Sequence, residues 1–311
     1  MRAVVVEEYG DPEVLRVGEV PEPTPSAGQV RVRVRAAAVN PVDLATRSGA
    51  LASWVPAGAS RPLVLGWDVA GTLDAVGAGV TGWSVGDEVV GMSDWFDAGV
   101  GTQAEAVVLG ADVLAAAPRG VAPEVAATLP LNAQTADQAL DLLDLPAGAT
   151  VLVTGAAGGV GGFAVSLAAA RGLEVVAVAG AADADLVTAR GAAVHLPWSE
   201  DLTGALRRLR PAGVDGVLDA AVVGPSLVGA VRDAGAFVSV LDPATPAGER
   251  GVRTAKVSVR GDGERLARLA RALEEGRLHT SVAEVLPFGG AAAAHARLAE
   301  GGVRGRLVLT P

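Results

Sequence analysis

The sequence predicts an α/β protein that combines a β-rich part with a parallel sheet, and three observations lead to this fold class. The chain has 311 residues, a length that favours about two domains. Half of the residues are hydrophobic yet only 3% are aromatic, so Val, Ala and Leu must fill most of the core, as they do in parallel sheets covered on both faces. Short apolar runs alternate with helical stretches through the middle of the chain, which is the order of βαβ units.

Residues 1–117 have the composition of strands and turns. The stretch QVRVRVRAAAV at 29–39 alternates apolar and charged residues, as a half-buried strand does. Proline clusters at 21–28 and a glycine-rich stretch at 75–91 are typical of loops and hairpin turns. This part is therefore expected to be a β-rich domain.

The pattern changes at about Pro118, where short apolar runs begin to alternate with helical stretches. The predicted strands are 149–154, 174–179, 192–196, 215–220, 236–241 and 255–259. Stretches such as 162–172 and 224–235 are predicted to be helical. Residues 118–261 are therefore expected to form a domain built on a doubly wound, parallel, six-stranded sheet.

After residue 262 the chain gives two more predicted helices, at 263–276 and 291–302, and a last strand at 304–310. We expect this tail to return to the first domain. The β-rich domain would then contain residues 1–117 and 262–311.

The composition argues against several classes of partner. The formal net charge is −10, with acids and bases interspersed, so the chain would repel nucleic acid. The absence of Cys excludes disulfides, thiol catalysis and Cys-based zinc sites. The first ten residues carry acids where a signal peptide has an apolar run, and no apolar span of about 18 residues occurs. We therefore expect a cytoplasmic protein with no nucleic-acid or membrane partner.

The most informative motif is the stretch VLVTGAAGGVGG at 151–162. It follows a predicted strand and opens a predicted helix, where free N–H groups and the helix dipole can bind a pyrophosphate. In the alignment Ala156-x-Gly158-x-x-Gly161, Ala156 takes the turn position, Gly158 lets the backbone approach the phosphates, and Gly161 lets helix and strand pack closely. Gly159 and Val160 lie in the same turn and are expected to contact the cofactor. The alternative is a glycine-rich turn without a ligand, but the six-strand context favours a Rossmann dinucleotide site.

Other motifs are excluded by single residues. A Walker loop needs a Lys that the glycine stretch lacks, because the only Lys is Lys256, and a Tyr-x-x-x-Lys dyad is impossible because the only Tyr is Tyr9. The sequence GWSVG at 82–86 matches a hydrolase nucleophile elbow, but it lies between two strand-like stretches, so Ser84 is predicted to be a turn residue. The three histidines are scattered and none lies near a second plausible metal ligand, so no metal site is expected.

The end of the second strand indicates which dinucleotide is bound. An acid there would hold the adenosine ribose of NAD, whereas Ala179 and Gly180 occupy that place and favour NADP(H). No Lys or Arg follows directly to neutralise a 2′-phosphate, so NAD(H) stays open as the alternative. Asp183 and Asp185 come slightly later and are expected to be N-terminal charges of the next helix.

Several further motifs match one family along nearly the whole chain. They are EYGDPEVL (7–14), AAAVNPVDLATRSG (36–49), LVLGWDVAGTLDAVGAGVTGWSVGDEVVG (63–91), LPLNAQTADQAL (129–140), the glycine stretch and GGVRGRLVL (301–309). Together they resemble the zinc-independent quinone oxidoreductases, the zeta-crystallin-like branch of the medium-chain dehydrogenase/reductase superfamily. The resemblance implies a GroES-like substrate domain beside the Rossmann domain.

The resemblance also implies a reaction without metal. Zinc alcohol dehydrogenases of this superfamily bind the metal through a Cys and the His of a GHE motif, whereas this chain has Asn40 near the Cys place and Gly66-Trp67-Asp68 in place of GHE. The lobe with the structural zinc is missing as well. By resemblance, the reaction is hydride transfer from NADPH to a quinone or an α,β-unsaturated carbonyl compound.

The resemblance assigns roles to individual residues. Asn40 is expected to hydrogen-bond near the nicotinamide ribose or the substrate, and Thr135 to place the nicotinamide, so these two are the catalytic candidates. The backbone at Ala220 and Leu241 is expected to line the cofactor site, and Trp198 to lie against the adenosine end.

Three positions qualify the resemblance. Asp43 is expected to order its own loop through an ion pair, with Arg47 as the partner. Ala45 stands where the family often has a Tyr near the substrate, which implies a roomier pocket. The family Lys that binds the 2′-phosphate is absent, with Ala184 or Asp185 near its place.

The resemblance implies a homodimer, with the edge strand at 254–259 available to pair across a two-fold axis. Two alternatives to the quinone or enone reductase stay open. One is an enoyl-thioester reductase, which should need a basic patch for its carrier. The other is a nucleotide-binding sensor or structural protein without turnover.

Overall fold

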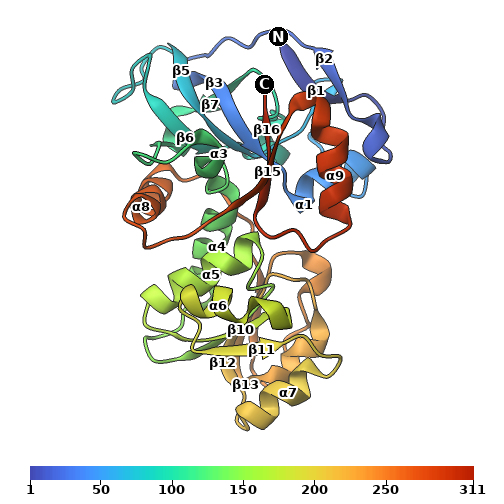
Figure 1. Ribbon diagram of the computed structural model, residues 1–311, viewed down its shortest axis with the longest axis vertical. Helices are drawn as coiled ribbons and strands as arrows, with labels where there is room; N and C mark the ends of the chain where they lie inside the picture. Colours follow the sequence, from blue (N-terminus) through green and yellow to red (C-terminus); the bar gives the residue numbers. More distant parts are fainter. The chain divides into compact units, whose positions relative to one another are not determined.

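The structure, a computed structural model, describes residues 1–311, which fall into two compact units (Figure 1). The β-rich unit contains Met1–Leu131, Arg260–Glu275 and Thr280–Pro311, and the nucleotide unit contains Asn132–Val259 and Gly276–His279. The first change of unit therefore falls inside helix α4 (Pro130–Leu143) rather than at residue 117.

The β-rich unit is built around a sheet with the strand order β15-β16-β3-β5-β6-β8, in which β7 also pairs with β3. Its strands are β3 (Gln29–Ala38), β5 (Asp68–Val76), β6 (Glu88–Met92), β7 (Ala106–Gly110), β8 (Leu114–Ala116), β15 (Val282–Pro287) and β16 (Arg306–Thr310). The alternation in β3 buries Val30, Val32 and Val34 on one face, as the sequence predicts. The strand β16 pairs antiparallel with the end of β3, so the tail of the chain closes the sheet that the first residues begin.

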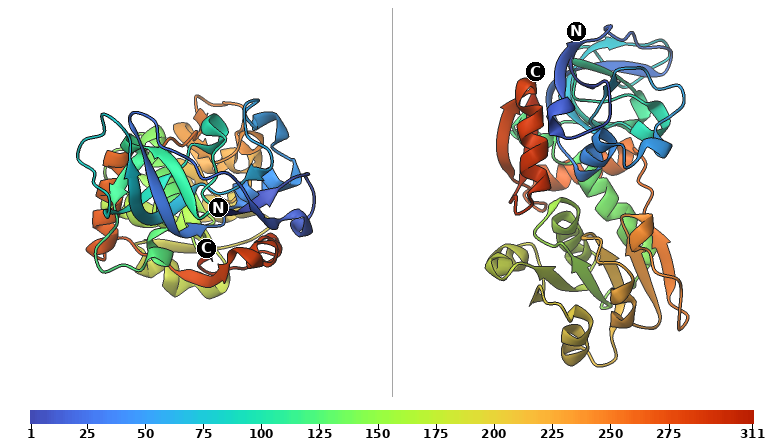
Figure 2. Two further views of the ribbon diagram at one scale, coloured as in Figure 1. Left: turned by 90° about the horizontal axis from the view of Figure 1, so that it is seen from above. Right: turned by 90° about the vertical axis from the view of Figure 1, so that its right-hand side faces the viewer.

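A smaller sheet and five helices complete this unit. The sheet has the order β2-β1-β4, formed by β1 (Arg2–Val6), β2 (Arg16–Glu19) and β4 (Leu63–Val64). The helices are α1 (Pro41–Ser48), α2 (Trp95–Ala98), α3 (Pro123–Ala126), α8 (Gly263–Glu274) and α9 (Ala291–Ala299). Figure 2 shows α9, in red, beside the blue N-terminal segment, where it packs against the 3₁₀ turn Pro12–Val14 and against α1.

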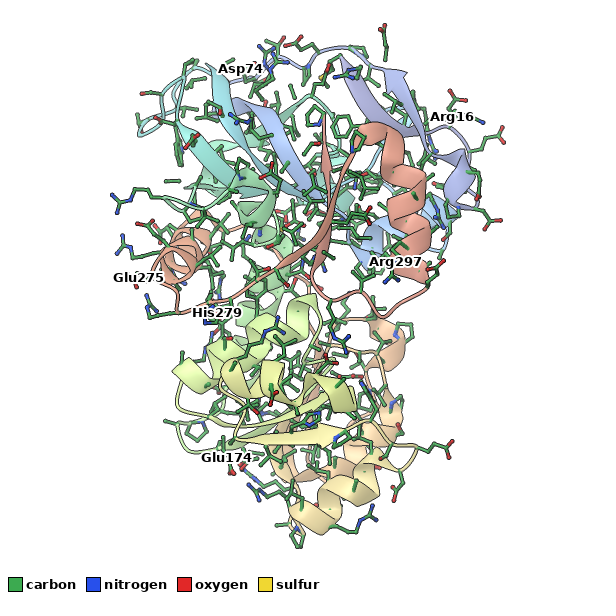
Figure 3. The ribbon with its side chains drawn as sticks, in the orientation of Figure 1. Arg16, Asp74, Glu174, Glu275, His279 and Arg297 are labelled. Carbon is green, nitrogen blue, oxygen red and sulfur yellow. The ribbon has the colours of Figure 1, made fainter.

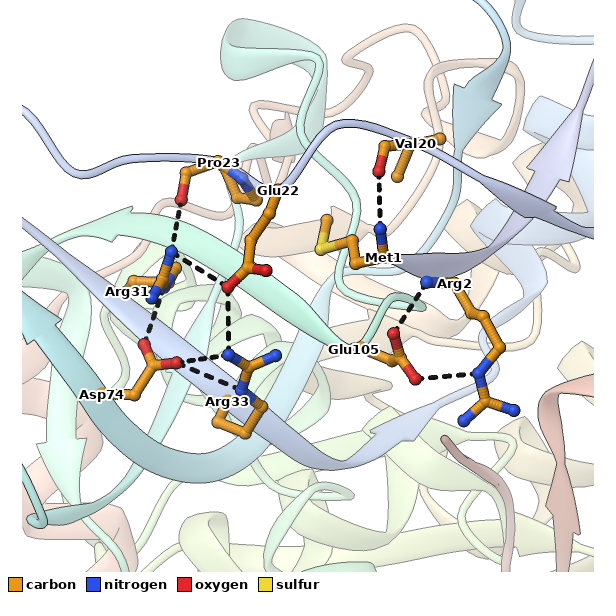
Figure 4. Close-up of polar contacts among 9 residues, drawn as sticks. All are labelled: Met1, Arg2, Val20, Glu22, Pro23, Arg31, Arg33, Asp74 and Glu105. Atoms are coloured by element: carbon orange, nitrogen blue, oxygen red, sulfur yellow. Dashed lines mark hydrogen bonds and ion pairs between the residues drawn. The ribbon is translucent and has the colours of Figure 1, made fainter.

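One group of charged side chains on this sheet is partly exposed to solvent. Asp74 accepts hydrogen bonds from Arg31 Nε at 2.8 Å and from Arg33 Nη2 at 2.7 Å, and Glu22 pairs with both arginines (Figure 4). Elsewhere on this unit, Arg16, Glu275 and Arg297 are labelled among the stick side chains of Figure 3. This polar exterior is consistent with the interspersed charges of the sequence.

The segment between β5 and β6, for which the sequence predicts a hairpin, folds as a turn. Ser84 N–H donates to the Asp87 carboxylate at 2.8 Å, and Asp87 N–H donates to the Ser84 carbonyl at 3.1 Å. Ser84 is therefore a turn residue, as predicted, and not a nucleophile raised between a strand and a helix.

The nucleotide unit confirms the predicted parallel six-stranded sheet. Its strands, in the spatial order β11-β10-β9-β12-β13-β14, are all parallel to their neighbours. They are β9 (Thr150–Thr154), β10 (Glu174–Ala179), β11 (Val194–Pro197), β12 (Val214–Asp219), β13 (Val231–Ser239) and β14 (Arg253–Lys256). Besides α4, the helices are α5 (Gly159–Ala170), α6 (Ala184–Ala189) and α7 (Leu202–Leu209). None of the helices in the chain has the length and apolar character needed to span a membrane.

One predicted helix is wrong. Residues 224–235 form only the 3₁₀ turn Pro225–Ala230, and β13 already begins at Val231. Gly224 has a φ of +85°, and Ala234 has a φ of +57° inside β13, so both fall outside helical geometry. The apolar residues of this stretch bury against the sheet from a turn and a strand, which periodicity alone does not distinguish from a short helix.

Candidate nucleotide site and buried polar network

The glycine-rich stretch forms the tight turn between β9 and α5. Gly155 has a φ of +62°, the Gly158 N–H donates to the Gly155 carbonyl at 2.8 Å, and Gly158 is the N-cap of α5. The Ala156 N–H donates to the Val178 carbonyl at 3.0 Å, which ties the turn to the neighbouring strand β10. The turn is therefore held in one conformation by the protein's own backbone.

The glycines of this turn face different constraints. A Cβ at Gly161 would lie 2.2 Å from the Gly155 carbonyl oxygen and 2.6 Å from its carbon, so helix and turn are too close for any side chain. A Cβ at Gly158 would meet only the Gly155 oxygen, at 3.1 Å, and Gly158 is exposed. The fold thus requires glycine at 161, whereas at 158 the space opens to the outside of the turn.

The first turn of α5 has the electrostatics of an anion site. The N–H groups at the start of a helix have no acceptor within the helix, and the helix dipole places partial positive charge there. Gly159, Val160 and Gly161 occupy this first turn. A pyrophosphate held by these amides needs no charged side chain in front of it.

The other predicted cofactor residues of this unit lie at the same edge of the sheet. Ala179 is the last residue of β10, and Gly180, Trp198 and Ala220 directly follow β10, β11 and β12. Because the strands are parallel, these residues all lie at carboxyl ends. The Trp198 N–H donates to the Ala179 carbonyl at 3.2 Å, and the Trp198 side chain is 44% exposed. The exposed Leu241 follows β13 at this edge.

The strand order places the glycine turn between two of these strands. From β9 the chain continues to one side of the sheet, through β10 and β11, and then returns to the other side of β9 to form β12, β13 and β14. The strand order therefore reverses at β9, and ligands of open α/β sheets bind at such a switch point. On the β12 side, Asp219 accepts hydrogen bonds from the Thr154 hydroxyl at 2.7 Å and from Gly224 N–H at 2.8 Å. This buried carboxylate therefore holds the backbone that follows β12.

Sequence reasoning missed one cation at the glycine turn. The Arg190 guanidinium donates from Nη1 to the Ala156 carbonyl at 3.0 Å, although the two residues are 34 positions apart. Arg190 comes after helix α6, so the residues that directly follow the second strand do not indicate it. A glycine at 162, one more than the alignment needs, is the sequence signal that could have indicated it. Asp185 lies in the first turn of α6, as predicted, and Asp183 directly precedes that helix.

In the β-rich unit, Asn40 and Asp43 are joined by a helix cap. Asn40 is the N-cap of α1, and its N–H donates to Asp43 Oδ2 at 2.8 Å. Asp43 Oδ1 also accepts the Gly66 N–H at 3.0 Å. The predicted ion pair with Arg47 is wrong: the Asp43 carboxylate turns back to the start of the helix, and the acids that raise the pKa of Arg47 are Asp11 and Glu13.

The Asn40 side chain lies between an anion and a cation. Its Nδ2 donates to Asp68 Oδ2 at 2.7 Å, its Oδ1 accepts a hydrogen bond from Arg306, and its residue is 1% exposed. A carboxylate cannot donate and a guanidinium cannot accept, so only one orientation of the amide satisfies both. Asp68 Oδ1 also accepts the Leu131 N–H at 2.6 Å, which anchors the first turn of α4. Thr135, a buried residue, lies one turn further along the same helix.

Two carboxylates and one guanidinium are buried together in this network. Burial, helped by the neighbouring Asp68 charge, raises the pKa of Asp43 to about 7, although hydrogen bonds from the backbone of Asn40 and Gly66 and the charge of Arg306 act in the opposite direction. Burial also raises the pKa of Asp68 to about 6, against its hydrogen bonds and the attraction of Arg306. The network therefore has a charge state that changes around neutral pH.

Comparisons with known proteins agree with this architecture. Residues 26–119 match the alcohol dehydrogenase GroES-like domain, and residues 191–309 match the zinc-binding dehydrogenase family. The NADPH-dependent alkenal/one oxidoreductase of Arabidopsis thaliana is 31% identical over 295 residues, which cover 93% of this chain and 73% of that protein. The quinone-oxidoreductase QR1 of Triphysaria versicolor is 30% identical, over 100% of this chain and 98% of its own length.

Several solved structures cover the whole chain, and two of them illustrate the match. The quinone oxidoreductase from Coxiella burnetii has a TM-score of 0.88 and 28% identity, and the match covers 100% of this chain and 99% of that one. A mycobacterial protein solved in complex with NADPH has a TM-score of 0.85 and 31% identity, with complete coverage of both chains. The chain belongs to the medium-chain dehydrogenase/reductase superfamily. It is an oxidoreductase with a nucleotide cofactor.

The donor set does not fit the zinc site found in some members of this superfamily. The chain has no Cys, Trp67 carries no metal-binding lone pair, and the Asn40 oxygen is already bonded by Arg306. No three or more acidic or His side chains are grouped so that they could hold a metal ion.

In this superfamily member, four aromatic side chains gather next to the Asn40 network. The Phe96 ring lies 5.8 Å from Trp54, 5.0 Å from Trp67 and 5.7 Å from Trp95, measured between ring centroids. Trp67 directly precedes Asp68 in the chain, whereas Trp54 is 48% exposed. The stretches 45–62 and 92–102, which the sequence left without assignment, thus meet in an aromatic contact.

Proposed function

We propose that this protein reduces quinones or α,β-unsaturated carbonyl compounds with NADPH, without a metal ion. The observation that carries the proposal is the glycine turn at the switch point of the six-stranded sheet, in a chain whose relatives are named quinone and alkenal oxidoreductases. Bound NADPH supplies a hydride to an electron-poor carbon of the acceptor.

The residues of the nucleotide unit would hold the cofactor along one sheet edge. Gly158 lets the backbone approach the pyrophosphate, and the first-turn amides of Gly159, Val160 and Gly161 bind it. Neither Ala179 nor Gly180 carries a negative charge that would repel a 2′-phosphate. Trp198 offers its exposed ring to the adenosine end.

Asn40 and Thr135 would act on the reacting end. In the reduction of an enone, negative charge develops on the carbonyl oxygen, and a fixed hydrogen-bond donor or a solvent proton can meet it. The Asn40 amide suits this role because Asp68 and Arg306 hold it in one orientation before substrate arrives. Trp67 and Phe96 supply an apolar, aromatic surrounding of the kind that binds flat quinones.

Steady-state assays test this proposal. We expect NADPH absorbance to fall when the protein is mixed with para-benzoquinone, menadione, methyl vinyl ketone or acrolein. Binding of NADPH without oxidation by any acceptor would contradict the reaction and favour the sensor alternative. Faster reduction of crotonyl-coenzyme A than of every enone would favour the thioester alternative.

The cofactor preference is tested by titration of tryptophan fluorescence, because the chain has five tryptophans. We expect tighter binding of NADPH than of NADH, and the opposite order would contradict the assignment of NADP(H).

We also infer a homodimer, since β14 is an edge strand of the six-stranded sheet. Sedimentation velocity should give the mass of two chains; a fully active monomer would contradict this inference.

A further inference from the structure

A guanidinium lies directly behind the glycine turn. Arg190 follows α6, and its side chain reaches across Gly162 of α5 to the Ala156 carbonyl. A Cβ at Gly162 would lie 2.4 Å from Arg190 Nη1 and 2.8 Å from Cζ, so only glycine admits the guanidinium in this place. The next residue, Gly191, has a φ of +101°, and a Cβ there would lie 2.7 Å from Ala169 Cβ. The end of α6 is therefore packed closely on α5, which limits the freedom of the arginine.

This contact fixes one peptide group of the turn. The Ala156 N–H is held by the Val178 carbonyl, and the Ala156 carbonyl is held by Arg190. In a planar trans peptide, the carbonyl of Ala156 and the N–H of Ala157 point in opposite directions. Because the carbonyl faces the guanidinium, the Ala157 N–H must face away from it. Ala157 itself is half-buried, and the next residue, Gly158, is exposed.

The guanidinium also adds charge where the cofactor carries its phosphates. Burial lowers the pKa of Arg190 and the nearby Asp183 raises it, but the group stays positive at neutral pH. Its Nε is buried without a hydrogen-bond partner. The positive charge therefore adds to the partial charge at the start of α5.

We propose that Arg190 is a positioning residue for the dinucleotide, which fixes the Ala156–Ala157 peptide and supplies positive charge behind the pyrophosphate. It acts through the turn and not on the reacting atoms. The inference rests on the cofactor site of the proposed function but is independent of the acceptor.

The test compares three ligands with two substitutions of Arg190. NADPH and ADP-ribose both contain the pyrophosphate, whereas adenosine 2′-monophosphate contains only the phosphate on the ribose. We expect Arg190→Met, which keeps the length of the side chain but removes charge and donors, to raise the Kd of NADPH and ADP-ribose about tenfold. The Kd of adenosine 2′-monophosphate should stay within about twofold. Arg190→Lys should restore part of the affinity, because it keeps the charge but not the planar donor geometry.

A matched control separates this effect from lost stability. Arg207 makes the same kind of contact elsewhere in the nucleotide unit, with its guanidinium donating to the carbonyls of Gly229 at 2.8 Å and Pro211 at 2.9 Å. Arg207→Met should lower the Tm without changing the Kd of any of the three ligands.

A second variant leaves Arg190 intact. Gly162→Ala should push the flexible end of the arginine away from the Ala156 carbonyl and weaken NADPH and ADP-ribose binding in the same direction. This variant keeps the inference testable if Arg190→Met does not fold.

Two outcomes would overturn the inference. In the first, the folded Arg190→Met and Gly162→Ala variants both bind NADPH within about twofold of the parent protein. In the second, Arg190→Met loses affinity for adenosine 2′-monophosphate but not for ADP-ribose, which would assign the arginine to the 2′-phosphate instead. If the parent protein binds NADPH but reduces no acceptor, the proposed function fails and this inference stands.

Discussion

Replacing Gly161 with Ala should disturb both folding and cofactor binding, and the structure gives the size of the disturbance. The new Cβ would lie 2.2 Å from the Gly155 oxygen, 2.6 Å from the Gly155 carbon and 2.9 Å from the Thr154 oxygen. All three atoms belong to the backbone, so relief requires a shift of the turn or of α5 by about 1 Å, since carbon–carbon contacts are most favourable near 3.5–4.0 Å. Overpacking of this kind costs about 1–3 kcal/mol.

Two effects partly offset each other in the measured stability. Alanine is a better helix former than glycine by about 1 kcal/mol, which reduces the net loss. We therefore expect Gly161→Ala to lower the free energy of unfolding by up to about 2 kcal/mol in urea titrations, from the difference of these two terms. The displaced turn should also raise the Kd of NADPH at least about tenfold, because the phosphate-binding amides move with it.

Gly158→Ala is the matched comparison for Gly161→Ala, because it adds the same methyl group to the same turn. Its Cβ would touch only the Gly155 oxygen, at 3.1 Å, so the fold should tolerate it with a change of about 0.5 kcal/mol or less. If the open side of the turn faces the phosphates, the new methyl group should still weaken NADPH binding about tenfold. Normal NADPH binding by Gly158→Ala would refute the placement of the pyrophosphate. A Gly161→Ala variant with unchanged stability and affinity would refute the packing argument.

Three further predictions concern the β-rich unit. Burial raises the pKa of Asp43 from 3.8 to about 7, so between these pH values the folded chain keeps a proton that the unfolded chain has released. The free energy of unfolding should therefore fall as pH rises through this window, by at most about 4 kcal/mol. Asp43→Asn should flatten the dependence of urea midpoints on pH. Asp68→Asn should lower kcat at least about tenfold, because the oxygen of the new amide cannot accept hydrogen bonds from both Asn40 and Leu131. Asp74→Asn, on the same strand, is the control and should leave kcat unchanged. An equal kcat in both variants would contradict the role of Asp68. Trp54→Ala should raise the KM of menadione about fivefold and leave that of acrolein nearly unchanged, and equal changes for both acceptors would contradict an aromatic contact.

Much of the fold could be predicted because it depends on local patterns. Alternation of apolar strands and helices determines a parallel sheet, and a glycine-rich turn after a strand determines where its ligand lies. The stretch 224–235 shows the limit of this reasoning, since its apolar residues are equally compatible with a helix and with a turn followed by a strand.

The contacts that could not be predicted depend on residues far apart in the chain. Arg190 reaches Ala156 only because α6 ends against α5 at two glycines, which no spacing rule reveals. The pair Asp43 and Arg47 has the i, i+4 spacing of a helical ion pair, but capping of the helix start by Asp43 takes precedence. The carboxylate instead belongs to a network completed by Arg306, from the other end of the chain.

The pairing of β16 with β3 has a consequence for the order in which the protein forms during synthesis. The six strands of the nucleotide sheet lie between residues 150 and 256, so that sheet can close while the last strand is still being made. The β-rich sheet cannot be completed by then, because β3 must wait for β16, whose Val308 pairs with Ala38. Chains stalled on the ribosome before Arg304 should therefore show a protease-resistant nucleotide unit and a protease-sensitive β-rich unit. Because Arg306 follows the whole nucleotide unit in the chain, a chain stalled before Arg304 should bind the cofactor while its Asn40 amide still lacks the Arg306 partner.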